Sequence, residues 1–339
     1  MIRMLFSLVC VFGILTGSLH AFTEEELMDI DGRKVFVKIS GRSKDNPYAF
    51  FLHYGPGGNT YYFEQTVGKD LEKQVTLVYI DFYGAGRSPH SDGMAVHTKK
   101  GLESFSTDRY IADILYVADY IGASKFGIIG HDFGAFLGLY CAAKVSDRVL
   151  WFAAINPQWD YPRNIRYLAT RMRDQFAEKQ NKSDPYTEAL MVDKVQRVEK
   201  IVYDGITEPE HIEQLSGLFR YVSNLYFSDE KTIHKHPVAK KMLKHELFQT
   251  TIGQMAFIGC AYNDKYFTKD AVPLLKHLNG KKVLCIVSDS MFVDPLQYER
   301  IRRDFPAVMF MEIPGGYYFP MIEKKKETTT ILQEFLKHQ

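Results

Sequence analysis

Short apolar runs and longer amphipathic stretches follow one another along most of the chain. Ala49–Tyr54 and Val75–Phe82 are nearly continuous apolar runs that end in glycine-rich turns, which is typical of parallel strands covered on both faces. Arg33–Ser40 instead alternates apolar and polar residues, which predicts a half-buried edge strand. Further strands are predicted at Lys125–Gly130, Val149–Ile155, Lys282–Val287 and Val308–Ile313.

Helices are predicted between these strands. Apolar residues recur at helical spacing over Thr107–Ile121 and form a closing stripe over Thr330–Leu336. Phe133–Lys144 is also predicted to be a helix. Its small residues Gly134, Gly138 and Ala142 lie four apart on one face, where the helix could approach a sheet closely. The alternation of strands and helices predicts an α/β fold, with a mostly parallel central sheet and helices on both of its faces.

One long segment interrupts this alternation. Pro157 to about Asp270 contains no convincing strand and is polar, helical in pattern, and rich in Tyr and Lys. Because strands are predicted on both sides of it, we interpret the segment as a helical insertion between two strands of the sheet.

The N-terminus has the pattern of a secretory signal peptide. Arg3 supplies a positive charge, Met4–Gly17 is apolar but short for a membrane span, and Ser18–Ala21 supplies small residues for cleavage. An uncleaved N-terminal anchor is the alternative interpretation. We expect a secreted, periplasmic or luminal protein with no stable membrane span after cleavage, since no other apolar stretch is long enough to cross a bilayer.

The composition and the net charge limit the classes of function that are expected for the chain. With 46% apolar and 24% charged residues among 339, the chain is ordinarily globular, and its net charge of +1 gives no general attraction to nucleic acid. No Walker loop, dinucleotide fingerprint or zinc spacing occurs, so no cofactor and no metal are expected. Cys10 would leave with the signal peptide. The other cysteines, which are expected to be buried free thiols, are Cys141, Cys260 and Cys285.

Three glycine-rich turns follow three of the predicted strands, at His53–Gly58, Asp81–Pro89 and Gly130–Gly134. In the third turn, glycines two before and two after Asp132 allow a sharp strand-to-helix turn that pushes this side chain out above the sheet. The N–H of Phe133 would lie at a helix N-terminus, where it can face an anion. A second anion-binding N–H would come from Tyr54–Gly55.

These turns resemble the α/β-hydrolase superfamily over essentially the whole chain after the signal. The first two look most like the His-Gly-Gly-Pro-Gly and Asp-x-Arg-Gly-x-Gly-x-Ser motifs of proline iminopeptidases. The elbow with Asp132 looks more like epoxide hydrolases and haloalkane dehalogenases, in which an Asp attacks carbon and a His-activated water hydrolyses the ester. The resemblance implies that the insertion is a cap, which gives residues 1–21 as signal, 22–156 and 271–339 as core, and 157–270 as cap.

The catalytic positions depart from this pattern. Met291 stands where the family carries its acid, and Asp289 and Asp294 flank it as possible substitutes. Tyr318 stands where the family carries its histidine, in Pro314–Pro320. Tyr54 replaces a glycine of the first turn, and Tyr83 replaces the arginine of the second. We therefore place the candidate catalytic positions at Asp132, Asp289, Asp294 and Tyr318, and the oxyanion or pocket positions at Tyr54, Gly55, Tyr83, Phe133, Met291 and Tyr317.

Three hypotheses follow for the function. The protein is an atypical or weak hydrolase acting on a small organic substrate through Asp132, or a pseudo-hydrolase that binds a small apolar or aromatic ligand, or a module that binds a protein partner through its cap. The hydrolase needs a base, because Tyr318 has an ordinary pKa near ~10. The other histidines considered for that role are His53, His90, His97, His131, His211, His234, His236 and His245. The oligomeric state cannot be predicted from the sequence.

Overall fold

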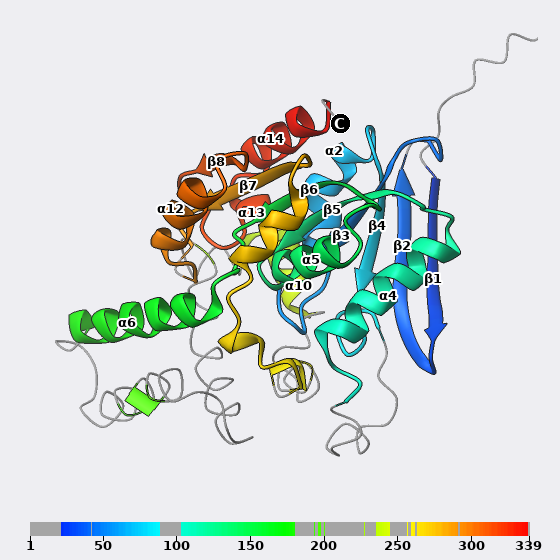
Figure 1. Ribbon diagram of the computed structural model, residues 1–339. Helices are drawn as coiled ribbons and strands as arrows, with labels where there is room; N and C mark the ends of the chain where they lie inside the picture. The colour runs from blue at the N-terminus through cyan, green and yellow to red at the C-terminus, as the bar shows by residue number, and fades with distance from the viewer. Residues whose placement is uncertain are drawn as a thin grey trace, which may run out of the picture.

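The computed structural model describes residues 22–41, 43–88, 103–179, 263–290 and 292–337, with short stretches and single residues between 193 and 261. The predicted signal peptide therefore lies outside the described residues. A mixed sheet of eight strands runs through the molecule in the order β1-β2-β4-β3-β5-β6-β7-β8 (Figure 1). Its strands are β1 (Phe22–Ile30), β2 (Arg33–Gly41), β3 (Tyr48–Leu52), β4 (Thr76–Asp81), β5 (Phe126–His131), β6 (Val149–Ile155), β7 (Lys282–Ser288) and β8 (Met309–Ile313).

The strand directions place the carboxyl ends of six strands along one edge of the sheet. β1 pairs antiparallel with β2, and β2 antiparallel with β4, whereas all pairs from β4 to β8 are parallel. Ligand sites of such sheets lie outside the carboxyl ends of the parallel strands. The predicted strands are confirmed to within two residues at either end, but β1 was not predicted. The prediction that Arg33–Ser40 forms an edge strand was therefore wrong, because β2 pairs with β1 on one side and with β4 on the other.

The helices predicted from the sequence are present, together with others. They are α4 (Thr107–Tyr120), α5 (Phe133–Lys144), α6 (Tyr161–Lys179), α10 (Pro237–Lys244), α12 (Pro295–Asp304) and α14 (Lys325–Lys337), with short turns at α1 (Tyr61–Phe63), η1 (Glu64–Gly68), α2 (Lys69–Leu71), η5 (Tyr266–Thr268), η6 (Val272–Leu278) and α13 (Pro320–Glu323). The closing helix α14 begins at Lys325, five residues before its predicted start. The helix α12 was not predicted.

Helices cover both faces of the sheet, and two neighbouring residues of β6 show how. Side chains of successive strand residues point to opposite faces. The indole of Trp151 meets Phe335 of α14, with 5.7 Å between the ring centroids. Phe152 points the other way, because a side-chain carbon at Gly138 of α5 would lie 2.9 Å from its ring. The two helices therefore pack on opposite faces, as predicted.

The small face of α5 allows this helix to approach the sheet closely. A side-chain carbon added at Gly134 would lie 2.0 Å from the carbonyl oxygen of Leu52 on β3. That separation is far below any possible van der Waals contact, so only glycine fits between the helix and the strand. The close approach fixes the height of the first turn of α5 above the carboxyl ends of β3 and β5.

The long segment between β6 and β7 contains helices α6 and α10, as its polar helical pattern predicted. Its two ends meet, because Asp160 and Asp270 form an isolated antiparallel bridge. Around this bridge the N–H of Ala271 donates to the carbonyl of Trp159 at 2.6 Å. The segment thus leaves and rejoins the core at one place, although the domain limits themselves stay a prediction.

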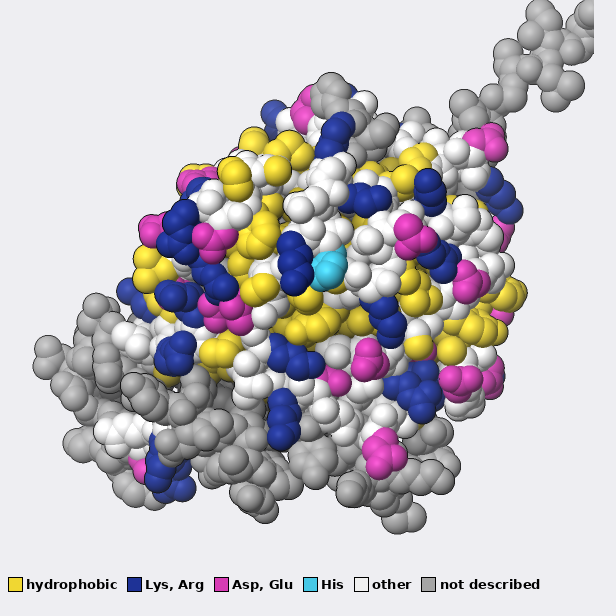
Figure 2. All heavy atoms as spheres, in the orientation of Figure 1, with side chains coloured by type: hydrophobic (Ala, Val, Ile, Leu, Met, Phe, Trp, Pro, Cys, Tyr) yellow, Lys and Arg dark blue, Asp and Glu magenta, His cyan; other side chains and the backbone are white. Residues whose placement is uncertain are grey.

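The distribution of surface charge and the state of the cysteines match what the sequence predicts. On the face shown in Figure 2, basic and acidic side chains are interspersed, in keeping with the net charge of +1. Cys141, Cys260 and Cys285 are buried and free, as predicted. Within the described ranges, no helix combines the length and the apolar character that a membrane span requires.

Candidate functional site

Asp132 lies at a strained turn between β5 and α5. Its backbone has φ 54° and ψ −113°, a region that residues other than glycine rarely enter, and its side chain is only 3% exposed. Such conformations cost on the order of 1–3 kcal/mol and persist only where the surroundings enforce them. Here the close packing of Gly130 and Gly134 enforces the turn, since a side-chain carbon at Gly130 would lie 2.5 Å from the carbonyl oxygen of Gly134. The predicted elbow is therefore present in the structure.

The carboxylate of Asp132 occupies the anion-binding position that the sequence predicted. The N–H of Gly55 donates to its Oδ2 at 3.3 Å, and the N–H of Phe133 donates to the same carboxylate. These two N–H groups are the ones expected to form an oxyanion hole. In this chain they bind a side chain of the protein itself.

The rest of the carboxylate is held by two side chains. The Gln158 amide donates to Oδ1, and the hydroxyl of Tyr318 also donates to the carboxylate. Burial raises the pKa of Asp132 to about 6, and the hydrogen bonds from Tyr318, Phe133, Gly55 and Gln158 oppose that rise. The net shift of the pKa is upward because burial removes more favourable hydration from the charged carboxylate than the hydrogen bonds from these donors replace.

Tyr318 is held rigidly in an aromatic shell. The centroids of the His131, Phe292 and Phe319 rings each lie 4.8 Å from that of Tyr318, and Tyr54 stands perpendicular to it at 6.0 Å. The side chain is 3% exposed. The hydroxyl at the family's histidine position is thus a fixed hydrogen-bond donor to Asp132.

Asn156, at the carboxyl end of β6, fastens the loop that carries Tyr318. Its amide nitrogen donates to the carbonyls of Tyr317 at 2.9 Å and Tyr318 at 3.2 Å, and to the Ser288 hydroxyl at 2.8 Å. Its oxygen accepts from the N–H of Ser288 at 2.9 Å. Asn156 and Gln158 were both missed by the sequence analysis. The available signal was their position directly after a buried parallel strand, where site residues gather.

His131 and His53 are occupied by structural hydrogen bonds. Nε2 of His131 lies 2.8 Å from the carbonyl of Tyr318 and therefore donates, which leaves Nδ1 to accept from the Tyr62 hydroxyl at 2.8 Å. Nδ1 of His53 lies 2.7 Å from the carbonyl of Tyr54, and its Nε2 accepts from the N–H of Phe82. Burial lowers the pKa of both rings, to about 3 for His131. Both imidazoles stay neutral and bind the backbone of the site.

One further candidate histidine lies among the described residues. His236 precedes α10, where burial lowers its pKa. The other histidines considered, which lie outside the described residues, are His90, His97, His211, His234 and His245.

The two possible acids have other partners. Asp294 caps the N-terminus of α12, where its Oδ1 accepts from the N–H of Leu296 at 2.9 Å, and its Oδ2 lies 3.3 Å from Arg163. The exposed Asp289 accepts a hydrogen bond from the N–H of Gly315. Met291, the residue at the family's acid position, lies outside the described residues. The carboxylate of Asp294 therefore caps a helix, and that of Asp289 holds a loop.

The predicted pocket residues separate into two groups. Tyr54, Gly55 and Phe133 lie with Asp132, and Tyr317 joins them through its carbonyl, with a strained φ of 44°. Tyr83 lies in another neighbourhood, where its ring stacks on Phe105 at 5.4 Å. Its carbonyl accepts from the Tyr110 hydroxyl at 3.3 Å. Tyr83 thus packs between the second turn and α4.

In the described part of the chain, no group of three or more His, Cys, Asp or Glu side chains is placed to bind a metal ion. The candidate site consists of one buried carboxyl group, two backbone N–H groups, one amide and one phenol.

Comparison with known proteins identifies the family. The model of the alpha/beta hydrolase fold matches residues 48–325. A probable aminopeptidase of Bacillus subtilis, YbaC, is 29% identical over 139 residues, which cover 39% of this chain and 42% of that protein. The chain thus aligns with less than half the length of that curated relative.

Solved structures agree on the fold. A proline iminopeptidase-related protein from Thermus thermophilus superposes with a TM-score of 0.64 at 19% identity, covering 93% of this chain and 98% of that one. A proline iminopeptidase from Mycobacterium smegmatis gives 0.64 at 14% identity, covering 94% and 98%. Haloalkane dehalogenases are also among the structural neighbours. The chain belongs to the alpha/beta hydrolase fold family.

Proposed function

We propose that this protein is a non-hydrolytic member of its family, which keeps the elbow site to bind a small apolar or aromatic molecule. The observation that carries the proposal is the state of Asp132. Its carboxylate fills the anion-binding position and accepts from the phenol of Tyr318, where a hydrolase of this family needs an imidazole.

The occupied anion site argues against acyl transfer. Peptide and ester hydrolysis in this fold place the developing oxyanion against the two backbone N–H groups, a contribution of about 3–4 kcal/mol per donor. In this chain the N–H groups of Gly55 and Phe133 are bound to a carboxylate instead. An incoming oxyanion would meet a negative charge there. Aspartate also lacks the hydroxyl that the serine route uses.

An aspartate-nucleophile reaction is the second candidate, and the geometry of Asp132 favours it over acyl transfer. With Oδ2 held by Gly55, the other oxygen attacks an epoxide carbon and breaks its C–O bond, and the ring oxygen takes a proton from solvent. With an alkyl halide the same attack expels a halide ion. Either step leaves an ester on Asp132. Hydrolysis of that ester needs a base, and loss of a general base typically costs about a hundred- to ten-thousand-fold in rate. The expected product is therefore a long-lived ester on Asp132.

Intact-mass measurement separates the two candidates. The mature protein would be incubated with styrene oxide and its mass measured. In a separate experiment, its binding of neutral aromatic compounds would be followed by ligand-observed NMR. The proposal predicts reversible binding that Asp132→Asn weakens, and no change in protein mass. A mass increase of one epoxide on the wild type, absent in Asp132→Asn, would replace it with the nucleophile reaction. Steady diol production abolished by the same variant would establish a hydrolase.

We also propose that the protein is exported. The support is the charged start at Arg3 followed by the apolar run Met4–Gly17 and the small residues Ser18–Ala21. Expression of the full chain with mass analysis of the secreted product tests this. A product beginning near Phe22 supports the proposal, whereas a full-length product retained in the cell contradicts it.

A further inference from the structure

The two outermost strands of the sheet differ in how their free edges are protected. β1 and β8 lie at opposite ends of the sheet (Figure 1). An edge strand presents unpaired N–H and C=O groups to which another strand can add, and proteins commonly protect such edges with charged side chains. Four of the nine residues of β1 are acidic, whereas the five residues of β8 include one charged side chain, Glu312. Strand addition is therefore less hindered at β8.

Apolar side chains are exposed along β8. Met309 is 42% exposed and Met311 is 45% exposed, and Phe310 between them is half-buried. Because side chains alternate along a strand, the two methionines share one face of the sheet and Phe310 lies on the other. On that other face Phe310 packs beside α12, where the guanidinium carbon of Arg302 lies 4.4 Å from its ring centroid. The edge thus combines free backbone groups with exposed apolar surface.

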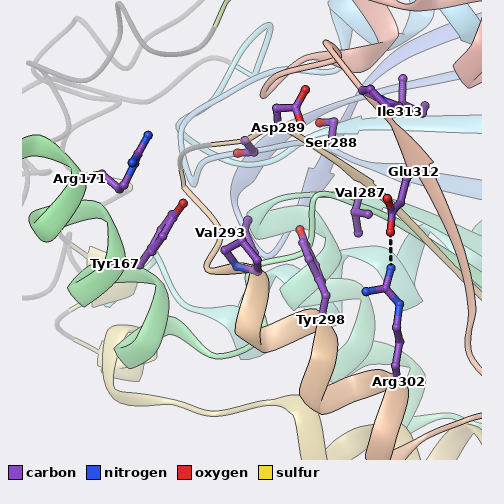
Figure 3. A pocket seen from close by; sticks show the side chains of 13 residues that line it. Tyr167, Arg171, Val287, Ser288, Asp289, Val293, Tyr298, Arg302, Glu312 and Ile313 are labelled. Carbon is purple, nitrogen blue, oxygen red and sulfur yellow. Dashed lines mark hydrogen bonds and ion pairs between the residues drawn. The ribbon is translucent and has the colours of Figure 1, made fainter. Parts of the chain in front are cut away.

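The charge on this edge is neutralised within the chain. Arg302 of α12 reaches the carboxylate of Glu312 at 2.6 Å, and Figure 3 shows this pair beside the pocket that α6, β7 and α12 border. Glu312 carries the only charge of β8 itself. With its partner in place, the edge has little net charge with which to repel an identical edge.

The sequence around Phe310 is symmetric in the way that a two-fold contact requires. When two β8 strands pair antiparallel about an axis at Phe310, each Met309 lies opposite Met311 of the other copy. The two Phe310 side chains then lie opposite each other, and Val308 lies opposite Glu312. Like groups meet, and no two charges of the same sign stand opposite one another. A contact between identical surfaces of this kind closes as a dimer.

Neighbouring registers of the same pairing are less favourable. An axis at Met311 would place the Phe310 ring opposite the Glu312 carboxylate, and an axis at Glu312 would place two carboxylates opposite each other. An axis at Met309 would bring Pro306 into the ladder, where it has no N–H to donate. The axis at Phe310 is therefore the expected one.

We propose that the protein associates as a two-fold dimer through antiparallel pairing of β8, which joins two eight-stranded sheets into one continuous sheet. The short strand and its few apolar side chains put the contact at the low end of specific interfaces, so the Kd should be about 1–100 µM. β8 is the third strand from β5, which leads into Asp132. The dimer therefore does not depend on the function proposed for Asp132.

Sedimentation velocity of the purified protein at about 1–200 µM tests the dimer. The expected result is a monomer–dimer equilibrium with its midpoint inside that range of concentration. A monomer at every concentration would overturn the proposal. An open-ended series of oligomers would also overturn it, because such a series indicates a head-to-tail contact.

Met311→Lys and Leu27→Lys form a matched pair of variants. Both add a charge at an apolar position of an outermost strand, which is 45% exposed at Met311 and 49% exposed at Leu27. By symmetry the charge at Met311 enters the contact twice, so the Kd should rise about tenfold or more. Leu27→Lys should dimerise as the wild type does, and both variants should melt as it does. Equal dimerisation of both variants, or weakening by Leu27→Lys alone, would contradict pairing through β8.

Cysteine cross-linking tests the register. Residues directly opposite in an antiparallel pair have Cα atoms about 4.5–5.5 Å apart, which a disulfide can span. Chains carrying Met309→Cys should therefore cross-link with chains carrying Met311→Cys under mild oxidation. Either variant alone should cross-link about tenfold more slowly, because its cysteines would lie diagonally, about 7–8 Å apart. The wild type is the control, since its described cysteines are buried. Equal rates in the mixture and in the separate variants, or no cross-link in the mixture, would overturn the proposal.

Discussion

The hydroxyl of Tyr318 donates a hydrogen bond to the buried carboxylate of Asp132. In a hydrolase of this fold, a histidine after the last strand takes and returns protons at the nucleophile. Here the same loop position, held by His131 and Asn156 through the Tyr318 carbonyl, delivers a phenol that only stabilises the negative charge. Tyr318 therefore stands at the position where these hydrolases carry that histidine.

The raised pKa of Asp132 predicts a specific pH dependence of stability. Its folded-state pKa is about 6, above the ordinary 3.8, so its contribution is fully present below about pH 4 and is lost as pH rises through about 6. Asp132→Asn removes this titration. From about pH 4 to about pH 7 the free energy of unfolding of the variant should therefore rise by about 2–3 kcal/mol relative to the wild type. Urea unfolding of both proteins at each pH measures it, and parallel curves would contradict the burial of a charged Asp132.

Tyr318→Phe should raise the pKa of Asp132 further, because the phenol is one of the donors that hold it down. Hydrogen bonds to a charged group contribute about 1.5–3 kcal/mol, and those between neutral groups about 1 kcal/mol. The destabilisation should thus be larger at about pH 8 than at about pH 4. Carbon-13 NMR of labelled aspartate gives the pKa directly. Tyr120→Phe, at an exposed position on α4, is the control. An unchanged Asp132 titration would remove Tyr318 from the site.

Asn156→Asp should lower the free energy of unfolding by about 2–4 kcal/mol at neutral pH, because a carboxylate would then face the carbonyls of Tyr317 and Tyr318. The backbone φ of 44° suits both Asn and Asp, so the change reports the lost amide donor. Asn279→Asp, on the exposed surface, should change stability by less than about 0.5 kcal/mol. Chemical unfolding measures both. Equal effects would show that Asn156 does not fasten the loop.

Gly134→Ala and Gly138→Ala form a graded pair within α5. Both gain the helix propensity of alanine, which is worth about 1 kcal/mol. At Gly134 the new carbon would meet backbone at 2.0 Å, whereas at Gly138 it would meet the Phe152 side chain at 2.9 Å. A side chain can move, but the β3 backbone cannot. The Gly134 variant should fail to give folded protein in a circular dichroism melt, while the Gly138 variant should melt within several degrees of the wild type.

The fold could be predicted because the apolar runs and glycine turns are local signals. Phe133–Lys144 and Val149–Ile155 were located to the residue, and the approach of Gly134 to the sheet follows from its spacing with Gly138. β1 was missed because its residues Phe22–Ile30 include acidic side chains at three consecutive positions, which obscure strand alternation.

The site was predicted in part. Asp132, Gly55 and Phe133 could be found because the elbow and the first turn have fixed spacings. Gln158 and Asn156 follow a predicted strand, but their roles could not be predicted, because those roles depend on which strand ends lie side by side, and that is decided by strand order. Tyr83 was placed by motif position alone, whereas packing on Phe105 determines where its ring lies.

Turnover of three substrates tests the central claim most directly. A nitrophenyl ester, a prolyl anilide and an aryl epoxide would be incubated with wild type, Asp132→Asn and Tyr318→Phe, and product formation followed against buffer. The replacement of the base by Tyr318 predicts no turnover above background for any of the three substrates. Sustained turnover of one substrate that disappears in Asp132→Asn would contradict the account and require a base from outside the described residues.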